Sequence, residues 1–342
     1  MRLGVYTFAH FCVDFSCFFM LFSWYSRGTH TDEIITVGFL TYNIIAFGLQ
    51  PVIGYFCDRN KRIPIELIGS VLLIGGLLFM SAPALSIVLM GLGNACFHIG
   101  GGIDSIVNSG GKMARSGVFV SSGALGVAYG SLIGINGWLS VEFFVVILAF
   151  CIVMMYVFCK KQPEPNKLRK RFAVAKPGLH FSAVIISAAA AISIRSYAGS
   201  IIPAVSLTVS GLLPLTAIGS FLGKAAGGFI ADRIGAKETA LLSLSAAAAL
   251  LTFGQMNPWI ISLGVLFLNM TMPITLCAVA SALHANPGLA FGTTTLALLC
   301  GNVPTFFTEP PTGVPTFVLL AACSMVCLQF ILRSKGKRDE NI

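Results

Sequence analysis

Two copies of one short motif decide the organisation of this chain: GYFCDRNKR at residues 54–62 and GFIADRIGAK at residues 228–237. Each copy has a glycine four residues before an Asp-Arg pair, and each lies between two long apolar segments. A glycine lets two helices approach closely, and a carboxylate can cap or pair near a helix end. Because about half of the 342-residue chain separates the copies, the sequence predicts two similar halves.

The composition excludes an ordinary water-soluble protein. The chain is 56% hydrophobic and 10% charged, with a mean hydropathy of +0.86, whereas soluble domains carry about 25% charged residues. Its apolar stretches have the length of helices that cross a bilayer, about 17–25 residues, and not the short alternating pattern of an outer-membrane barrel. The sequence therefore predicts an all-α integral membrane protein with many crossings.

Twelve membrane-spanning helices are expected, most of them joined by short connections. They are predicted at residues 5–24, 34–54, 64–81, 84–108, 117–137, 140–159, 179–198, 203–230, 238–254, 258–282, 289–308 and 314–333. The longest connection, 160–178, carries seven basic residues and three prolines and lies near the midpoint. We therefore expect an N-terminal six-helix half over 1–159, a basic linker over 160–178 and a C-terminal six-helix half over 179–342.

The positive charges indicate orientation rather than nucleic-acid binding. The net charge is +9, but all except three of the 22 Lys and Arg residues fall in loops or tails that one topology places on a single side. The exceptions are Arg27, in a loop on the opposite side, and Arg195 and Lys224, which lie within helices. Since basic loops stay in the cytoplasm, both termini are expected there, and no nucleic-acid partner is expected.

Ionisable side chains inside a bilayer are costly, so each of them suggests a role. Asp14 lies near the middle of the first span, and His10 precedes it by one helical turn on the same face. Burial penalises the charged form of a carboxylate, which suits a group that takes up and releases a proton. His10 could share that proton or bind a substrate. For both residues the alternative is a structural hydrogen bond between helices.

A second polar pair lies in the fourth span, where Asn94 and His98 are four residues apart. Helical spacing places them on one face, where they could line the same cavity as His10 and Asp14. Asp104 is nearer the inner end and on a different face, so pairing with a basic residue of the following loop competes with a role in transport.

Two cations lie within the second half. Arg195, near the outer end of the seventh span, could attract an anionic substrate or extend its charge to the interface. Lys224, close to the inner end of the eighth span, is expected to reach the interface. Neither paired Cys-x-x-C elements with metal spacing nor an ATP-binding motif is present, so no metal or cofactor is expected.

The duplicated Gly-x-x-x-Asp-Arg motif resembles the signature loop of the major facilitator superfamily, which lies on the cytoplasmic side between the second and third helices of each half. The resemblance implies the major facilitator fold, with two six-helix halves around a central path, a monomeric state and alternating access. It also implies conformational gating by six residues: Gly54, Asp58, Arg59, Gly228, Asp232 and Arg233.

Four further stretches resemble the fosmidomycin-resistance type of facilitator. They are AHFCVD at 9–14, GLGNACFH at 91–98, IRSY at 194–197 with IP at 202–203, and NPGLAFG at 286–292. This resemblance implies a proton-driven exporter, an antiporter, of small and often anionic compounds in a bacterial inner membrane. Its polar positions match His10, Asp14, His98 and Arg195. The chain departs from the pattern at Ile99, which replaces a proline, and at Asn60, which replaces a glycine.

Three functions are compatible with these residues. The first is a secondary active transporter that exports a small drug or metabolite in exchange for protons. The second is an importer or facilitator for a metabolite anion held by Arg195 and the histidines. The third is an intramembrane enzyme using His10, Asp14 and His98. The duplicated halves argue against the enzyme, so the expected partners are a small-molecule substrate, protons and the lipid bilayer.

Overall fold

The structure is a computed structural model of the 342-residue chain. It describes residues 1–26, 31–60, 63–159, 172–205, 212–254, 257–309, 311 and 315–334. Arg27, the last two residues of the first motif copy and the 160–171 part of the predicted linker lie outside the described residues.

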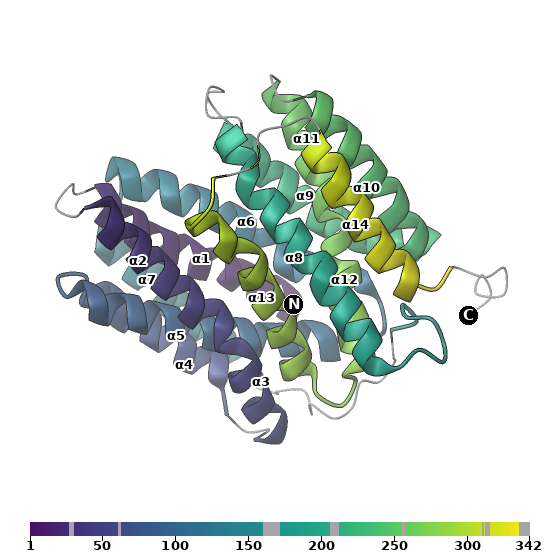
Figure 1. The fold of residues 1–342 in the computed structure, drawn as a ribbon. Coiled ribbons are helices and arrows are strands. Elements are labelled where there is room, and N and C mark those ends of the chain that lie inside the picture. The colour runs from purple at the N-terminus through teal and green to yellow at the C-terminus, as the bar shows by residue number, and fades with distance from the viewer. Residues whose placement is uncertain are drawn as a thin grey trace.

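The described residues form helices in an unbroken succession, without a named strand (Figure 1). In chain order they are α1 (Arg2–Ser26), α2 (Asp32–Asn43), η1 (Ile44–Gly48), α3 (Gln50–Arg59), α4 (Ile65–Leu78), α5 (Pro83–Val107), α6 (Met113–Asn136), α7 (Val141–Phe158), α8 (Phe181–Val205), α9 (Leu212–Ile234), α10 (Ala236–Phe253), α11 (Pro258–Asn269), α12 (Thr271–Ala282), α13 (Pro287–Asn302), η2 (Val303–Phe306) and α14 (Pro315–Ile331).

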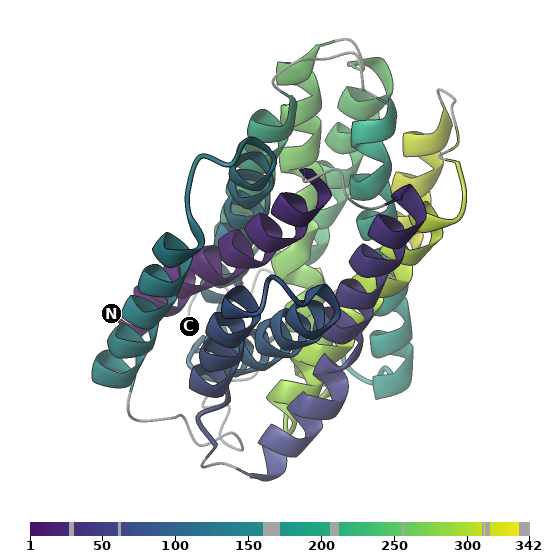
Figure 2. The same cartoon turned by 90° about the vertical axis from the view of Figure 1, so that its left-hand side faces the viewer.

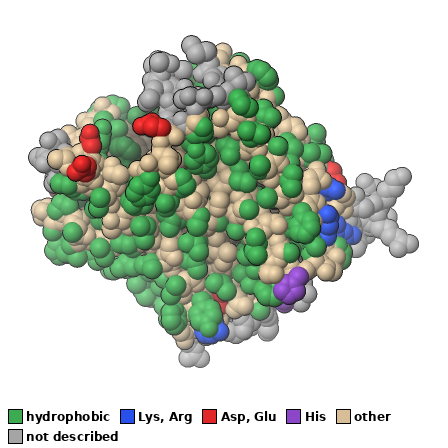
Figure 3. Space-filling view, viewed as in Figure 1, with side chains coloured by type: hydrophobic (Ala, Val, Ile, Leu, Met, Phe, Trp, Pro, Cys, Tyr) green, Lys and Arg blue, Asp and Glu red, His purple; other side chains and the backbone are tan. Residues whose placement is uncertain are grey.

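Ten helical runs within the described ranges are long and apolar enough to cross a membrane. Three of these runs each combine two helices, α2 with α3, α11 with α12 and α13 with η2. Two further apolar helices, α4 and α14, are shorter. Figure 3 shows the matching surface, in which apolar side chains cover most of the visible face and charged groups lie toward its edges. The predicted all-α membrane architecture is confirmed.

Prolines account for several interruptions of these runs. Pro51 has no N–H to donate and its ring crowds the carbonyl of residue 47. The wide π turn η1 lies at this point, between α2 and α3. The run from α11 to α12 breaks at Met270, just before Pro273, and α13 ends just before Pro304. The helices are therefore interrupted near Pro273 and Pro304, whereas α8 continues past Pro203.

One predicted boundary was wrong. The seventh span was expected to end at residue 198 and the eighth to begin at Pro203, but α8 continues to Val205 and α9 is described from Leu212. A proline in the last turn removes a single hydrogen bond, so the helix can include it. Arg195 consequently lies inside α8 rather than near its end.

Helix α1 lies at the centre of its neighbours and packs against α5, α6 and α7. Its closest partner, α6, contributes glycines at four-residue spacing. A Cβ added at Gly126 would lie 2.5 Å from the Phe11 carbonyl oxygen, and one at Gly134 would lie 2.7 Å from that of Phe19. The small residues of α6 therefore allow close packing against α1.

The helices gather into two groups, α1–α7 and α8–α14, which Figure 1 shows side by side and Figure 2 shows one in front of the other. Contacts between the groups join α6 to α9 and α12, and α13 to α3 and α5. The assignment of these groups to halves divided at 160–178 remains a prediction.

Candidate functional site

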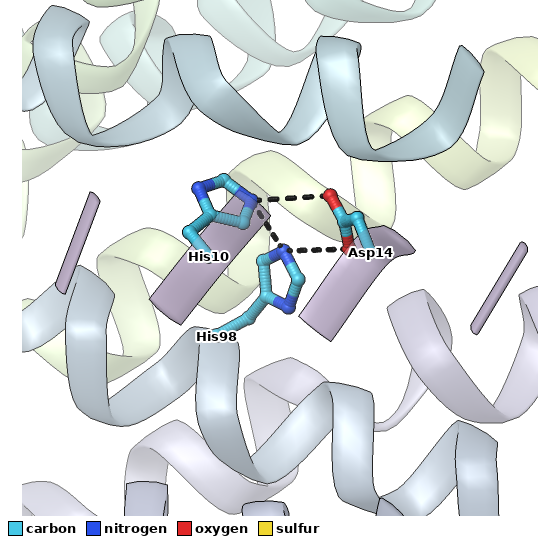
Figure 4. A group of neighbouring side chains, drawn as sticks. All are labelled: His10, Asp14 and His98. Atoms are coloured by element: carbon cyan, nitrogen blue, oxygen red, sulfur yellow. Dashed lines mark hydrogen bonds and ion pairs between the residues drawn. The ribbon is translucent and has the colours of Figure 1, made fainter. Parts of the chain in front are cut away.

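Three ionisable side chains from two helices meet in the interior (Figure 4). His10 Nε2 lies 3.2 Å from Asp14 Oδ2, His98 Nε2 lies 3.7 Å from Asp14 Oδ1, and the two Nε2 atoms are 2.9 Å apart. The residues are only 4%, 8% and 5% exposed, respectively. Helical spacing in the sequence predicted each pair within its own helix, and the packing of α1 on α5 joins them into one cluster, here called the triad.

Asn94 completes the predicted group around Asp14. Its Nδ2 donates to Asp14 Oδ1 at 3.1 Å and lies 3.6 Å from Cys17 Sγ. On the other side is Gly123 of α6, where an added Cβ would overlap a carboxylate oxygen of Asp14. The triad therefore needs both an amide donor and a residue without a side chain beside it.

Backbone carbonyls orient both imidazoles. His10 Nδ1 lies 2.7 Å from the carbonyl oxygen of Phe119, and His98 Nδ1 lies 2.9 Å from that of Asn94. A carbonyl oxygen can only accept a hydrogen bond, so each Nδ1 is the donor. The phenyl ring of Phe119 also stacks on His10, with ring centroids 4.8 Å apart. The sequence analysis missed Phe119, because a backbone acceptor leaves no signal in side-chain type.

The triad has the donor types of a metal site, since its three ligand atoms lie within 4.8 Å of one another. Two imidazole nitrogens on one tetrahedral zinc ion would be about 3.3 Å apart, from Zn–N bonds of about 2.05 Å. The observed 2.9 Å between the Nε2 atoms of His10 and His98 is the distance of an N–H···N hydrogen bond. The geometry thus favours a proton over a tetrahedral metal ion.

Arg195 is buried near the middle of α8. Its Nη1 donates to Thr275 Oγ1 at 3.2 Å and to Thr271 Oγ1 at 3.4 Å, and the residue is 5% exposed. The guanidinium therefore does not extend to the interface, which was one of the two expectations. The two threonines, one turn apart on α12, were not predicted. Their i, i+4 spacing was the available signal.

Lys224 on α9 was expected to reach the interface, and its position corrects this expectation. The ammonium is close enough to Asp14, His98 and Arg195 to interact electrostatically with all three. No hydrogen bond or ion pair of its side chain is found within the described residues. The cause is the packing of α9 on α6, where an added Cβ at Gly117 would lie 2.6 Å from the Lys224 carbonyl oxygen.

The first motif copy contacts the other group of helices through its carboxylate. Asp58, 5% exposed, accepts hydrogen bonds from the backbone N–H groups of Gly288 at 2.8 Å and Leu289 at 2.9 Å, in the first turn of α13. We call this contact the Asp58 latch. The first N–H groups of a helix lack internal partners and carry partial positive charge, so a carboxylate is stabilised there.

The second copy repeats this arrangement. Asp232 accepts from the backbone N–H groups of Met113 at 2.8 Å and Ala114 at 3.0 Å, in the first turn of α6. We call this contact the Asp232 latch. Both latches join the two groups of helices at one end of the bundle. The arginines have other contacts, and Arg59 lies over the Tyr55 ring, 3.5 Å from its centroid.

Glycines allow the close approach at both latches. A Cβ added at Gly54 would overlap the carbonyl oxygen of Gly288, and one at Gly228 would lie 2.7 Å from the Cα of Ala114. The motif glycine thus holds two backbones together while the aspartate, one turn later, caps the partner helix. The gating role itself remains a prediction.

Replacing Asp58 or Asp232 by asparagine is expected to loosen the latch that it forms. The variant keeps one acceptor oxygen but loses the charge that the helix N-terminus stabilises, which costs about 1 kcal/mol. The ratio of closed to open molecules at this end should fall about fivefold, measured by labelling a cysteine introduced at the altered latch, between α3 and α13 for Asp58 or between α9 and α6 for Asp232. Asp104→Asn is the matched control, because Asp104 pairs with Arg2 at 2.7 Å within one group of helices. Equal opening in the control would contradict the latch.

Comparison with known proteins identifies the fold. No protein-family model matches the chain, and no curated protein sequence matches it. Solved structures do match: the Escherichia coli fucose:proton symporter FucP, in a single-substitution variant, has a TM-score of 0.63 at 11% identity, covering 98% of each chain. A structure of the major facilitator superfamily transporter FucP in the outward conformation has a TM-score of 0.61 at 12% identity, covering 96% of this chain and 99% of that one. The chain therefore has the fold of major facilitator superfamily transporters.

Proposed function

We propose that the protein is a secondary transporter that couples the movement of a small anionic compound to protons by alternating access. The observation that carries this proposal is a set of ionisable groups inside the bundle, from both groups of helices: the buried triad on α1 and α5, the buried Arg195 on α8, and the partly buried Lys224 on α9. Groups so costly to bury are expected where a transporter binds its cargo and its ion.

The two cations support an anionic cargo. Arg195 donates to threonine hydroxyls, and within the described residues no carboxylate forms an ion pair with it or with Lys224. A buried positive charge without a counter-ion attracts an anion, and a guanidinium can bind a carboxylate or a phosphonate through two parallel hydrogen bonds.

Export by antiport is the first mode that we propose, in a bacterial inner membrane with both termini in the cytoplasm. It is supported by the four stretches that resemble the fosmidomycin-resistance type of facilitator. In this mode the latches close the cytoplasmic end, a monomer suffices, and the two halves rock about the site.

Symport of an anion with a proton is a second candidate, favoured by one electrostatic observation. Lys224 interacts with Asp14, His98 and Arg195, so an anion bound at the two cations would lie near the triad. A nearby negative charge favours the protonated form of such a group. The anion and the proton would then be bound at the same time, as symport requires.

Accumulation of candidate anions, with fosmidomycin among them, tests the proposed function. Efflux-deficient bacteria carrying the protein or an empty vector are compared with and without an uncoupler. Export predicts lower accumulation that the uncoupler abolishes, and symport predicts higher accumulation that it also abolishes. If no compound and no uncoupler makes a difference, the transport proposal fails.

Arg195→Gln is expected to raise the KM for the transported anion by about 10- to 150-fold, because a hydrogen bond to a charged group contributes about 1.5–3 kcal/mol. The measurement is initial uptake or efflux against substrate concentration. Arg115→Gln is the matched control, since Arg115 lies 3.8 Å from Asp104, among α1–α7. An unchanged KM in Arg195→Gln would show that the guanidinium does not bind the cargo.

A further inference from the structure

We infer that the exchangeable proton of this site is held between the imidazoles of His10 and His98, with Asp14 as its counter-ion. The part of this proton in transport rests on the proposed function, whereas its position between the two rings does not. It differs from the simpler assignment in which the carboxylate of Asp14 itself takes up and releases the proton.

The hydrogen bonds to the backbone fix the tautomer of both rings. Each Nδ1 faces a carbonyl oxygen, at 2.7 Å from Phe119 and 2.9 Å from Asn94, and must carry a hydrogen. A neutral imidazole has a single N–H, so each Nε2 would then be a bare lone pair. Two bare lone pairs cannot approach to the observed 2.9 Å without a hydrogen between them.

A proton on Asp14 does not resolve this conflict. A neutral carboxyl group could donate to His10 Nε2 at 3.2 Å, but the lone pairs of His10 and His98 would still face each other. A single proton between the rings satisfies both of them and makes the pair a cation. The ionised carboxylate, 3.2 Å and 3.7 Å from the two Nε2 atoms, then neutralises that charge.

Few other charged groups lie around the triad that could act as the counter-ion of the protonated histidine pair. Among the described residues, the polar groups facing the triad are Asn94 and Cys17, which contact the Asp14 side of it, and the distal cation Lys224. Helix α6 contributes a glycine and a backbone carbonyl, and Tyr42 of α2 lies behind Cys17. Arg195 interacts electrostatically with Lys224.

This arrangement makes the triad neutral when it holds one proton and singly negative when it does not. Loss of the proton leaves two lone pairs in contact, so His10 and His98 must separate. The rings belong to α1 and α5, and proton release is therefore linked to a change in how these helices meet. Lys224, which interacts electrostatically with Asp14 and His98, is the cation available to offset the resulting negative charge.

Nitrogen-15 NMR of the histidine side chains tests the inference in the full-length protein in lipid nanodiscs, between about pH 5 and pH 9. Signals are assigned with His10→Gln and His98→Gln. We expect both Nδ1 atoms to stay protonated throughout, and a single Nε2 proton to be shared and lost in one step. In Asp14→Asn this step should move to lower pH by about 1–3 units, the usual effect of a neighbouring opposite charge. His180→Gln, which removes an exposed histidine, should leave it unchanged.

Four results would overturn the inference. One is an Nε2–H tautomer in either ring at high pH, and another is independent titration of the two rings. The third is a pair that stays neutral while a carbon-13 label on the Asp14 carboxyl group reports proton uptake. Spectra are recorded with a chelator and again with zinc, and a shared signature seen only with zinc also overturns it. Since no cargo is needed, a shared proton without any transport would refute the proposed function alone.

Discussion

Asp14→Asn is expected to reduce proton-driven transport at neutral pH by about 10- to 1,000-fold, with recovery as the medium is acidified. Removing an opposite charge within hydrogen-bonding distance lowers the affinity for a proton by about 1–3 pH units. The amide keeps the shape of the side chain and can still accept from Asn94, so the fold should survive. The measurement is the initial rate of transport against pH for a compound identified by accumulation.

Asp104→Asn is the control for this prediction as well. Asp104 is a buried carboxylate on α5, but its hydrogen bonds go to Arg2 Nε at 2.9 Å and Asn108 Nδ2 at 2.9 Å, away from the triad. Its replacement should leave the pH dependence of transport unchanged. If Asp14→Asn transports with the pH dependence of the wild type, Asp14 has no part in coupling.

Gly54→Leu is expected to reduce the ratio of closed to open molecules at the latch end by about 5- to 150-fold. Even the Cβ of the new side chain overlaps the carbonyl oxygen of Gly288, and overpacking costs about 1–3 kcal/mol. In the proposed gating the groups of helices separate at this contact, so we expect the clash to be relieved by opening rather than by unfolding. Transport should fall, and a cysteine probe between α3 and α13 should become more reactive.

Gly4→Leu and Gly69→Leu complete the comparison. Gly4 lies in α1 with nothing within 4 Å of an added Cβ, so its replacement should change neither transport nor opening. Gly69 of α4 would clash with the backbone of α5 at 2.5 Å from Phe97 N. That contact lies within one group of helices, so its variant should lose thermal stability instead. A loss of stability in Gly54→Leu as large as in Gly69→Leu would contradict a contact that opens.

The fold was predictable from the sequence to a large extent, because membrane helices reveal themselves by length and composition. The duplicated motif located the loops that reach across the structure, and helical spacing paired His10 with Asp14 and Asn94 with His98. What spacing could not supply was the rotation of one helix against another. The 2.9 Å contact between His10 and His98 depends on α1 and α5 meeting on those faces.

Other parts of the site were missed for related physical reasons. The Phe119 carbonyl that orients His10 belongs to the backbone, which every residue type has. Lys224 was expected near a helix end, where a lysine commonly extends to the interface, but α9 runs from Leu212 to Ile234 and places it near mid-helix. A glycine on α6, Gly117, brings α9 close at this point. The contact of Arg195 with Thr271 and Thr275 required knowing that α8 continues past Pro203.

The π turn η1 gives the Asp58 latch a dependence on local helix geometry rather than on residue identity. A π turn holds one more residue than an α turn, and each residue advances a helix by about 100°. The face of α3 that carries Gly54 and Asp58 is therefore turned about 100° from where a regular helix continuing from α2 would place it. Closing Ile44–Gly48 into a regular helix without removing a residue would direct the motif away from α13, although every residue of the motif would still be present, whereas deleting one residue there would leave the motif facing α13.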